Sequence, residues 1–398
     1  MRLGSSDGRS CPEAPPTSIG HLTNTICPTL PAQTSPTTPA ALTESFSVAL
    51  TQAVEARLDP ATLRRAHRRL HRKALVIGLW YLGSYFALLF VSGWLLGALA
   101  CAAMALAFAA VGFNIQHDAN HNAFFATGGT KRLTWANRVA GWSMFALGAD
   151  ANRRIYRHGT LHHSAPNIGG VDTDIALGPL ARLAPSQPHH PWHRYQHFYL
   201  WILYCFTTVE IMLSDLTALL AESLHPTERR AKPATRDYAL ALGTKLAAGI
   251  VLLGVPMLFH PWWIVVLGAA GVLAGAGLVL GVIFQSAHVV EEAEFADQAT
   301  RSGYRWHEWQ VRSSLDFSHG TGPLSRALRW YAGGLDHQTE HHLFPRVPHT
   351  AYPDIATVVT DVCQRYGIPR HVQPSLHAAI ASHARHIRAM GRPPANPS

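Results

Sequence analysis

Two long blocks without charged residues dominate the pattern of hydrophobic and polar positions along the chain. Ala74–Gln116 holds 43 residues and Leu246–Ala287 holds 42, with no Asp, Glu, Lys or Arg in either block. Because about 20 apolar residues cross a bilayer as a helix, each block is long enough to cross twice. The Ser92-Gly93-Trp94 and His260-Pro261 steps provide turns within the blocks. We therefore predict four transmembrane helices, at about 74–92, 95–115, 238–259 and 263–284.

Basic residues flank both predicted hairpins and are absent from their turns. They precede and follow the first hairpin and precede the second, as Arg64, Arg65, Arg68, Arg69, Arg72, Lys73, Lys131, Arg132, Arg153, Arg154, Arg157, Arg229, Arg230, Lys232 and Arg236. Cytoplasmic loops of membrane proteins carry an excess of Lys and Arg. This distribution predicts a multi-pass membrane protein whose termini and central segment are both cytoplasmic.

The hydropathy pattern divides the chain into seven segments and predicts an all-α integral membrane protein. Its four transmembrane helices would form two hairpins beneath a cytoplasmic helical cap. The expected segments are a disordered tail at 1–45, a basic interfacial helix at 46–73, transmembrane hairpins at 74–115 and 238–287, cytoplasmic segments at 116–237 and 288–370, and a basic tail at 371–398. The aromatic stretches Leu133–Ala149 and Tyr195–Leu220 are expected to lie at the interface or fold back on the spans.

Composition narrows the function classes. Only 14% of the 398 residues are charged and 48% are apolar, against roughly 25% charged residues in an ordinary globular domain. Five scattered cysteines do not support a disulfide scaffold. The net charge of +9 suits an anionic membrane surface, and the absence of a CxxC finger or an RNA-binding strand pattern predicts no nucleic-acid partner. Histidine occurs 25 times, and this surplus is the main indication of function.

Three histidine clusters follow the predicted spans. They are His117-Asp118-Ala119-Asn120-His121, His158-Gly159-Thr160-Leu161-His162-His163, and His337-Gln338-Thr339-Glu340-His341-His342. Residues four apart share one face of a helix, so such a pair can bind one metal or line a shared cavity. The pairs with this spacing are His117/His121, His158/His162 and either His337/His341 or Gln338/His342. The adjacent His163 and His342 would point about 100° away, toward a second metal. Neutral imidazole suits iron, zinc or copper.

Other polar residues near the boxes are candidates for metal binding or for orienting the ligands. His288, at the end of the last span, is a functional candidate, although a helix-end histidine bonded to backbone is the alternative. The carboxylates Asp118, Asp336 and Glu340 stand beside box histidines and could hold their outer N–H groups. The run at 189–197 is interpreted as an interfacial loop entering a helix. For the C-terminal His377, His383 and His386, surface or membrane contact is expected.

These residues resemble the membrane fatty acid desaturase family. The likeness rests on Asn114-Ile115-Gln116-His117-Asp118-Ala119-Asn120-His121, on the HxxxHH of the second box, and on Gln338-Thr339-Glu340-His341-His342-Leu343-Phe344-Pro345. It covers about residues 60–370. A third box that begins with Gln resembles the front-end branch, which places a double bond between an existing one and the carboxyl end of the chain.

The resemblance implies a di-iron centre and an O2-dependent desaturation that leaves a cis double bond. Carried over to this sequence, the metal ligands would be His117, His121, His158, His162, His163, His288, Gln338, His341 and His342. His337, four residues before His341, competes with Gln338 for a place in this set. The substrate would be a fatty acyl group on a membrane lipid or on CoA. Because no His-Pro-Gly-Gly haem motif of a fused cytochrome b5 domain occurs, electrons would come from a separate ferredoxin or cytochrome b5-like protein.

Two alternative functions remain open, and the position of the substrate tunnel is not fixed by the sequence. A histidine-box enzyme could instead hydroxylate or ketolate a sterol, carotenoid or alkane. A protein of another class, a metal transporter or sensor, could carry zinc or copper, but such a protein should place ionisable groups within the bilayer. An apolar tunnel for an acyl chain could draw on the central aromatic residues Trp142, Phe145, Tyr199, Trp201 and Phe206, which could equally be core or lipid-facing residues.

Overall fold

A computed structural model describes residues 45–126, 131–224, 234–297, 303–318, 320 and 322–394. The expected disordered tail at 1–45 lies outside the described residues except for Ser45. The described part is mostly helical, and the regular elements beside its helices are two three-residue strands. The fold class is therefore as expected, although the small sheet was not foreseen.

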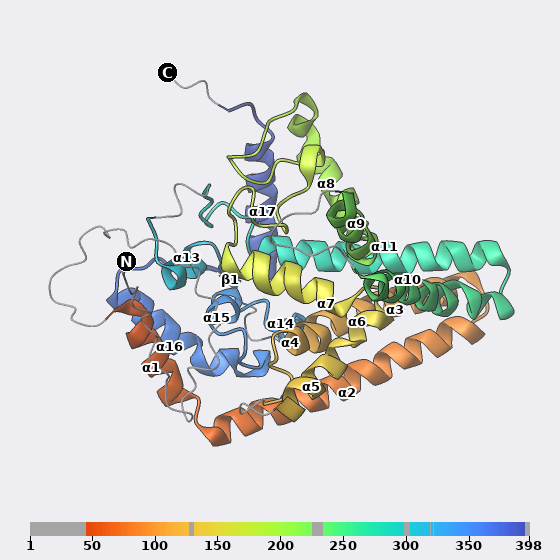
Figure 1. Cartoon of the computed structure of the whole chain (residues 1–398), viewed down its shortest axis with the longest axis horizontal. Coiled ribbons are helices and arrows are strands. Elements are labelled where there is room, and N and C mark those ends of the chain that lie inside the picture. The colour runs from red at the N-terminus through yellow and green to blue at the C-terminus, as the bar shows by residue number, and fades with distance from the viewer. Residues whose placement is uncertain are drawn as a thin grey trace, which may run out of the picture.

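Within the described residues, four helices are long and apolar enough to cross a membrane: Pro60–Phe90, Trp94–Asn120, Thr235–Leu258 and Trp262–Ser286. They comprise α2 (Pro60–Phe90), α3 (Trp94–Val111) with its extension, α10 (Thr235–Gly249) with its extension, and α11 (Trp262–Ser286). Figure 1 shows the two hairpins side by side, with both turns at the right-hand end and the remaining elements gathered toward the other end. The chain is an integral membrane protein by this arrangement.

The basic segment and the first span form one helix. Asp59 caps α2 by accepting a hydrogen bond from the Thr62 amide, and Pro60 occupies the first helical position, where its missing N–H costs nothing. The helix then runs without a break to Phe90. The boundary expected at residue 73 is therefore not a structural one. The arginines of this segment project from the end of a span, whereas Lys73 is buried. A separate helix, α1 (Phe46–Arg57), precedes it.

The hairpins pack through small residues on α3 and α11. Burial of alanines along α3, with Ala276 on α11, lets the two backbones approach closely. A Cβ built on Gly275 would lie 3.0 Å from the Cβ of Ala105, so even one added carbon would crowd this contact. The hydrophobic effect does not drive helices together within lipid, so the close packing of their backbones stabilises this contact instead.

The aromatic stretch after residue 191 folds back on the spans. Helices α8 (Gln196–Tyr204) and α9 (Thr207–Leu224) meet at an angle of 82°, as a broken span or a re-entrant loop would. Helix α11 passes this bend through Gly277, where an added Cβ would lie 2.7 Å from the carbonyl oxygen of Cys205. The expected fold-back of this stretch is thus found, with a sharp break within it.

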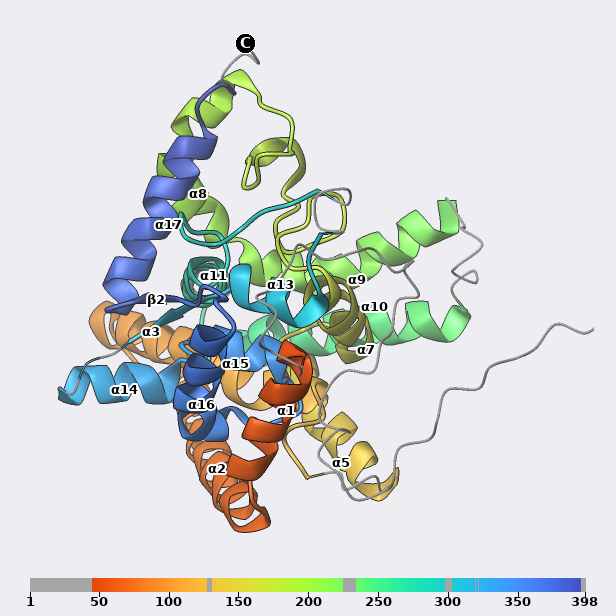
Figure 2. The same cartoon turned by 90° about the vertical axis from the view of Figure 1, so that its left-hand side faces the viewer.

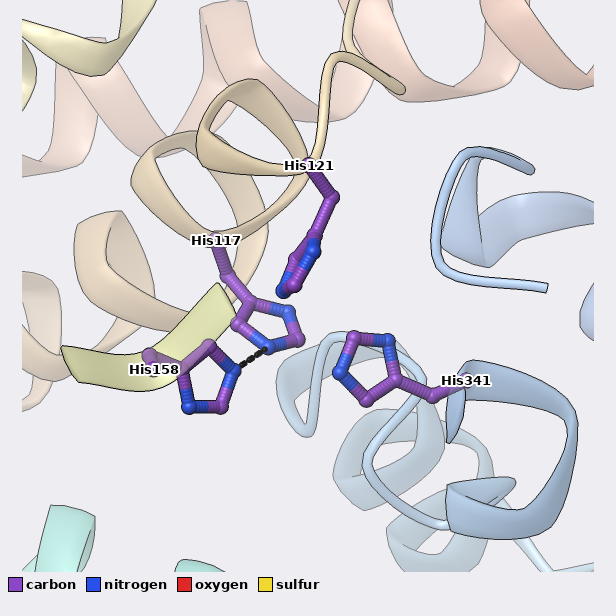
Figure 3. Close-up of side chains that lie close together, drawn as sticks. All are labelled: His117, His121, His158 and His341. Carbon is purple, nitrogen blue, oxygen red and sulfur yellow. Dashed lines mark hydrogen bonds between the residues drawn. The ribbon is translucent and has the colours of Figure 1, made fainter. Parts of the chain in front are cut away.

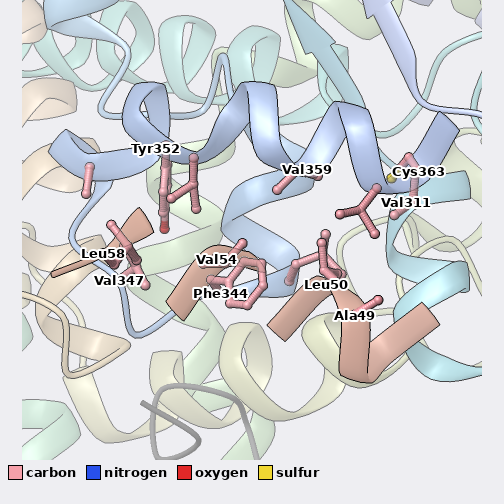
Figure 4. Close-up of a cluster of buried hydrophobic side chains, with 14 of the residues drawn as sticks. Ala49, Leu50, Val54, Leu58, Val311, Phe344, Val347, Tyr352, Val359 and Cys363 are labelled. Carbon is pink, nitrogen blue, oxygen red and sulfur yellow. The ribbon is translucent and has the colours of Figure 1, made fainter. Parts of the chain in front are cut away.

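An apolar core on the opposite end of the molecule from the turns holds the third histidine box. Helix α1 packs against α16 (Tyr352–Arg365), and Figure 4 shows Leu50 and Val54 of α1 on the side that faces α16, with Leu58, just after α1, beside Val347. Leu343, Phe344 and Val347, directly after the third box, belong to the same cluster and are buried. Each such side chain contributes about 1.5–3 kcal/mol when removed from water, so this core fixes the segment that carries the box.

The C-terminal segment is part of the fold rather than a tail. Strand β2 (His371–Gln373) pairs in parallel with β1 (Leu315–Phe317), with Leu315 opposite His371. Helix α17 (Leu376–Met390) then packs beside α8, as Figure 2 shows. His377 is exposed as expected, but His383 and His386 are buried, so the expectation of surface contact is wrong for these two. Their Arg neighbours in sequence mark only the outer face of an amphipathic helix.

Short helices connect these layers. They are α4 (His117–Asn120), α5 (Lys131–Gly141), α6 (Ser143–Ala146), α7 (Ala151–Arg154), α13 (Trp306–Arg312), α14 (Pro323–Tyr331) and α15 (Gln338–Leu343). π-Helical turns occur at Gly112–Gln116, Ile155–His162 and Ile250–Gly254, and 3-10 turns at Gly178–Leu180, Pro191–Tyr195, Pro256–Leu258 and His349–Ala351. The run at 189–197 enters α8 through one of these turns, as expected.

Replacing Gly277 by Ala should loosen the contact between α11 and the α8–α9 bend. Its new Cβ would meet the backbone of Tyr204 and Cys205, which cannot move as a side chain can. Overpacking of this kind costs about 1–3 kcal/mol, so the melting temperature of the detergent-purified chain should fall. Gly271→Ala, on the same helix with nothing within 4 Å of the new carbon, is the matched control and should not lower it.

Candidate metal centre

The first histidine box stands where a span ends in a π-helical turn. Gly112–Gln116 forms this turn between α3 and α4, and His117 and His121 follow on α4 and at its end. π-Bulges within helices are frequent at functional sites because they redirect side chains. Both imidazoles are buried.

The second box lies within a π-helix, and this changes which residues share a face. His158 and His162 belong to the π-helical segment Ile155–His162, whose turns hold more residues than an α-helix. His163, five residues after His158, brings its Nε2 to 3.4 Å from the Nε2 of His158. The expectation that His163 points away from His158, based on α-helical spacing, is therefore wrong, whereas His158 and His162 do share one possible metal-binding set, together with Asp174.

The third box is delivered by a pair of glycines in left-handed conformation. Gly333 and Gly334 have φ values of 66° and 81°, which residues with a side chain rarely adopt. A Cβ on Gly334 would lie 2.6 Å from the Cβ of His349. The turn thus needs glycine for both its dihedral angles and its space, and it directs α15 with His341 and His342 into the interior.

Four histidines from all three boxes form the first group, shown in Figure 3. One ring nitrogen of each of His117, His121, His158 and His341 lies within 4.8 Å of the others. The Nε2 atoms of His117 and His158 are 3.1 Å apart. Two nitrogens bound to one metal at about 2.0–2.1 Å lie roughly 3.0–3.4 Å apart, so this spacing suits a shared ion.

A second group lies next to the first. His162, His288 and His342 bring ring nitrogens within 4.8 Å of one another, and the Nε2 atoms of His162 and His288 are 3.3 Å apart. The side-chain amide of Gln338 lies 2.7 Å from Nε2 of His288. His163 forms a further set with His341 and His342, so it stands between the two groups. All nine side chains singled out from the sequence therefore converge.

Hydrogen bonds on the far side of the rings fix their tautomers. Nδ1 of His162 donates to the Asp172 carboxylate at 3.0 Å, and Nδ1 of His288 donates to the Ser313 carbonyl oxygen at 2.9 Å. The Gln310 amide donates to a backbone carbonyl, so its oxygen accepts from Nδ1 of His342 at 2.7 Å. Tyr352 contacts Nδ1 of His341 through its hydroxyl group, at 3.1 Å. Such partners orient metal-binding imidazoles.

The carboxylates expected to orient the ligands contact other residues instead. Asp118 accepts from Nδ1 of His349 at 2.9 Å. Glu340 contacts Arg370 at 2.8 Å and His337 at 3.5 Å, and Asp336 lies 3.8 Å from His337. Adjacency in sequence misled the expectation, because neighbouring residues on a helix point in different directions. A sequence signal for the carboxylate partner of His162 was available. Asp172 and Asp174 lie in the loop after the second box, nine and eleven residues after His163.

His337 does not belong to the histidine groups. Its ring faces the carboxylates of Asp336 and Glu340. Burial alone would lower the pKa of His337, but these carboxylates outweigh it and raise the pKa to about 9. Of the two competing residues at the start of the third box, Gln338 is the one that faces the site.

Burial keeps most of the clustered imidazoles neutral. It lowers the pKa of His158 to about 4 and that of His288 to about 3, and it holds the pKa of His341 and His342 well below the usual range. Burial also opposes charging of His162, but the nearby carboxylates of Asp172 and Asp174 raise its pKa. Neutral imidazole is the metal-binding form.

The arrangement suits a bound cation. In the neutral forms of His162 and His288 the proton is on Nδ1, so each Nε2 presents a lone pair toward the other ring. The Nε2 atoms of His121, His341 and His342 are buried without a hydrogen-bond partner. Buried acceptors without partners cost about 1–3 kcal/mol each, and a metal ion between them removes this cost. The donor set therefore fits metal ions.

A narrow cavity adjoins the first group. Its lining is mostly apolar, with Phe108, Gly112, Gln116, Met144, Leu147, Arg154, Thr208, Ile211, Leu280 and Phe284. The Phe284 ring lies 6.4 Å from that of His117 and 6.3 Å from that of His158, between centroids. The aromatic residues suggested from the sequence do not line this cavity. Trp142 and Phe206 are exposed on the apolar outer surface, as lipid-facing residues would be.

Comparison with known proteins identifies the family. The model of the fatty acid desaturase family matches residues 92–374, which is more than half of the chain. The chain belongs to the fatty acid desaturase family. This desaturase is 34% identical over 334 residues to the sn-1 linoleoyl-lipid 6-desaturase of Synechocystis sp. (strain ATCC 27184 / PCC 6803 / Kazusa), covering 83% of this chain and 90% of that protein.

Two further relatives have related activities in their names. An sn-1 linoleoyl-lipid 6-desaturase of Arthrospira platensis is 32% identical over 325 residues, 81% of this chain and 85% of that protein. An acyl-lipid (8-3)-desaturase of Physcomitrium patens is 31% identical over 333 residues, 82% of this chain and 67% of that protein. The protein is a fatty acid desaturase, an oxidoreductase of lipid metabolism, and its family membership favours this class over the metal transporter or sensor.

Replacing Asp172 by Asn should weaken metal binding without unfolding the desaturase. The amide keeps the shape of the side chain but removes the charge that supports Nδ1–H of His162. Loss of such an outer partner typically lowers metal affinity by about 10–100-fold. Metal retained after dialysis against graded chelator concentrations measures the effect. Asp361→Asn, an exposed carboxylate on α16, is the control, and equal loss in both variants would contradict the assigned role.

Proposed function

We propose that the protein is an O2-dependent acyl-lipid desaturase that introduces a cis double bond with a di-iron centre. The observation that carries this proposal is the pair of facing Nε2 atoms of His162 and His288, next to a second group of four buried histidines. Two adjacent groups of neutral imidazoles suit two metal ions, and imidazole is a ligand of iron. Family membership supports iron over zinc or copper.

The ligand assignment follows the two groups. His117, His121, His158 and His341 would hold one iron, and His162, His288, His342 and Gln338 the other. His163 stands between them with His341 and His342. A neutral amide at Gln338 is a weaker ligand than imidazole, so this position is the one most easily exchanged for another ligand.

Two bound irons supply the oxidation with O2 that an unactivated C–H bond requires, since a side-chain acid or base contributes only about 10²–10⁴-fold. The residues of the chain provide geometry and exclusion of water. The buried imidazoles are locked by Asp172, Ser313 and Gln310 on their outer sides. Phe284 and the narrow apolar cavity beside His117 and His158 mark the side from which acyl methylenes would approach the metal centre.

The substrate proposed is an acyl group on a glycerolipid rather than on CoA. This rests on the relatives, whose names specify linoleoyl-lipid and acyl-lipid substrates. The names of the two linoleoyl-lipid 6-desaturases support introduction of the double bond at position 6 of a linoleoyl group. Arg154, at the cavity and 6.0 Å from the Phe284 ring centroid, is placed to interact with the polar end of such a chain.

Electrons would come from a separate ferredoxin or cytochrome b5-like protein. We propose that both termini and the histidine boxes are cytoplasmic, because the turns of both hairpins lack Lys and Arg while the flanking segments are rich in them. A basic cytoplasmic face attracts an acidic carrier through complementary charge. This favours an acidic ferredoxin.

Expression in a host with a simple lipid profile tests the proposal directly. Fatty acid methyl esters from cells fed linoleate should contain a product with one additional cis double bond at position 6, and lipid class separation should find it on glycerolipid. His162→Ala should abolish the product, because it removes a ligand. His377→Ala, which changes an exposed histidine outside the cluster, should retain it. A hydroxylated product, or none from any fed acyl chain, would contradict the proposed reaction.

A further inference from the structure

A second pocket lies between the basic end of α2 and the amphipathic helix α14, outside the metal groups. Its volume is about 500 Å³. The lining includes residues of α2, of α14 and of the segment around the 3-10 turn His349–Ala351. Its size is suited to a group of several heavy atoms rather than to a water or an ion.

The charge of this pocket is strongly one-sided. Five cationic side chains line it, namely Arg69, Arg72, Lys73, Arg326 and Arg329. Asp336 is the one carboxylate among its lining residues, and that residue is buried beside His337. Lys73 is held in place, with Nζ 2.9 Å from Nε2 of His349 and 5.4 Å from the Trp330 ring centroid. The pocket is therefore a pre-arranged site for an anion.

Its position relative to the membrane indicates what kind of anion. On α2, the exposed apolar side chains Leu75 and Leu79 follow the pocket directly, and Val76 lines it. On α14, Leu324 is 73% exposed and Trp330 is 39% exposed, as expected of residues that rest in the lipid interface. The cations thus lie at the level of lipid headgroups, with apolar surface beneath them.

We propose that this pocket binds the phosphate of an anionic glycerophospholipid headgroup. Basic pockets at the cytoplasmic end of spans attract anionic headgroups. One Arg guanidinium group can bind a phosphate through two parallel hydrogen bonds. The exposed Leu75 and Leu79 provide a path for the acyl chains that a free nucleotide or phosphate does not use. Asp336 and His337 line the pocket and directly precede Gln338, so the bound lipid lies beside the third histidine box.

Isothermal titration of the full-length desaturase in neutral detergent tests this site. The ligands are dioctanoyl phosphatidylglycerol, dioctanoylglycerol, coenzyme A and inorganic phosphate. Phosphatidylglycerol should bind at least about tenfold more tightly than the other three, because only it has both the phosphate and the acyl chains. Binding of coenzyme A or inorganic phosphate with equal affinity would assign the pocket to a soluble anion and overturn the lipid.

A matched pair of double variants separates the pocket from general attraction by the basic helix. Arg72→Gln with Arg329→Gln removes two lining cations, and phosphatidylglycerol affinity should fall about tenfold or more. Arg64→Gln with Arg68→Gln removes the same charge from exposed positions on α2 outside the lining, and affinity should change by less than about twofold. Equal losses would show attraction by net charge alone and would overturn the proposal. Equal melting temperatures confirm that both variants are folded.

The experiments can refute the headgroup site and the proposed reaction independently of each other. Loss of desaturation with intact, pocket-dependent lipid binding would count against the reaction alone. Normal product formation by an enzyme that binds all four ligands equally would count against the headgroup site alone. The double variants change no residue assigned to the metal centre, so product formation can be measured in both.

Discussion

Lone pairs of buried imidazoles that face one another are the constraint on which the rest of the structure depends. The outer partners of His162 and His288 place the protons on Nδ1, and the two Nε2 atoms then meet at 3.3 Å. When both rings are neutral, the facing lone pairs repel each other, and a positive charge between them removes this repulsion. Bound metal ions would remove this cost, and the same geometry would hold the ligands ready for them.

Separate parts of the fold hold the first box, the third box and the segment of His288 in position. The close α3–α11 contact sets the position of the first box at the end of a span. The core between α1 and α16 holds the third box. The C-terminal helix holds the segment of His288, because His383 donates from Nδ1 to the Val289 carbonyl oxygen at 2.6 Å and its Nε2 lies 2.7 Å from the Tyr204 hydroxyl. Burial lowers the pKa of His383 to about 4, so it remains neutral in this role.

The spans and the clustering of the boxes were predictable, for reasons specific to membranes. Lipid excludes charge, so 43 uncharged residues that end just before His117 predicted two spans and placed the first box at a span end. The distribution of Lys and Arg predicted the other two boxes on the same side of the membrane. The pairing within the boxes was not predictable, because the π-helix at Ile155–His162 replaces α-helical spacing. The outer partners Ser313 and Gln310, far from the boxes in sequence, and the burial of His383 depend on tertiary packing that local periodicity does not contain.

Iron content per chain tests the central claim most directly. The desaturase, expressed with iron and purified in detergent, would be assayed by elemental analysis with its sulfur as the measure of protein. The two histidine groups predict about two irons per chain. One iron per chain, or occupancy by zinc with no iron, would contradict the account of a di-iron centre built from these nine side chains.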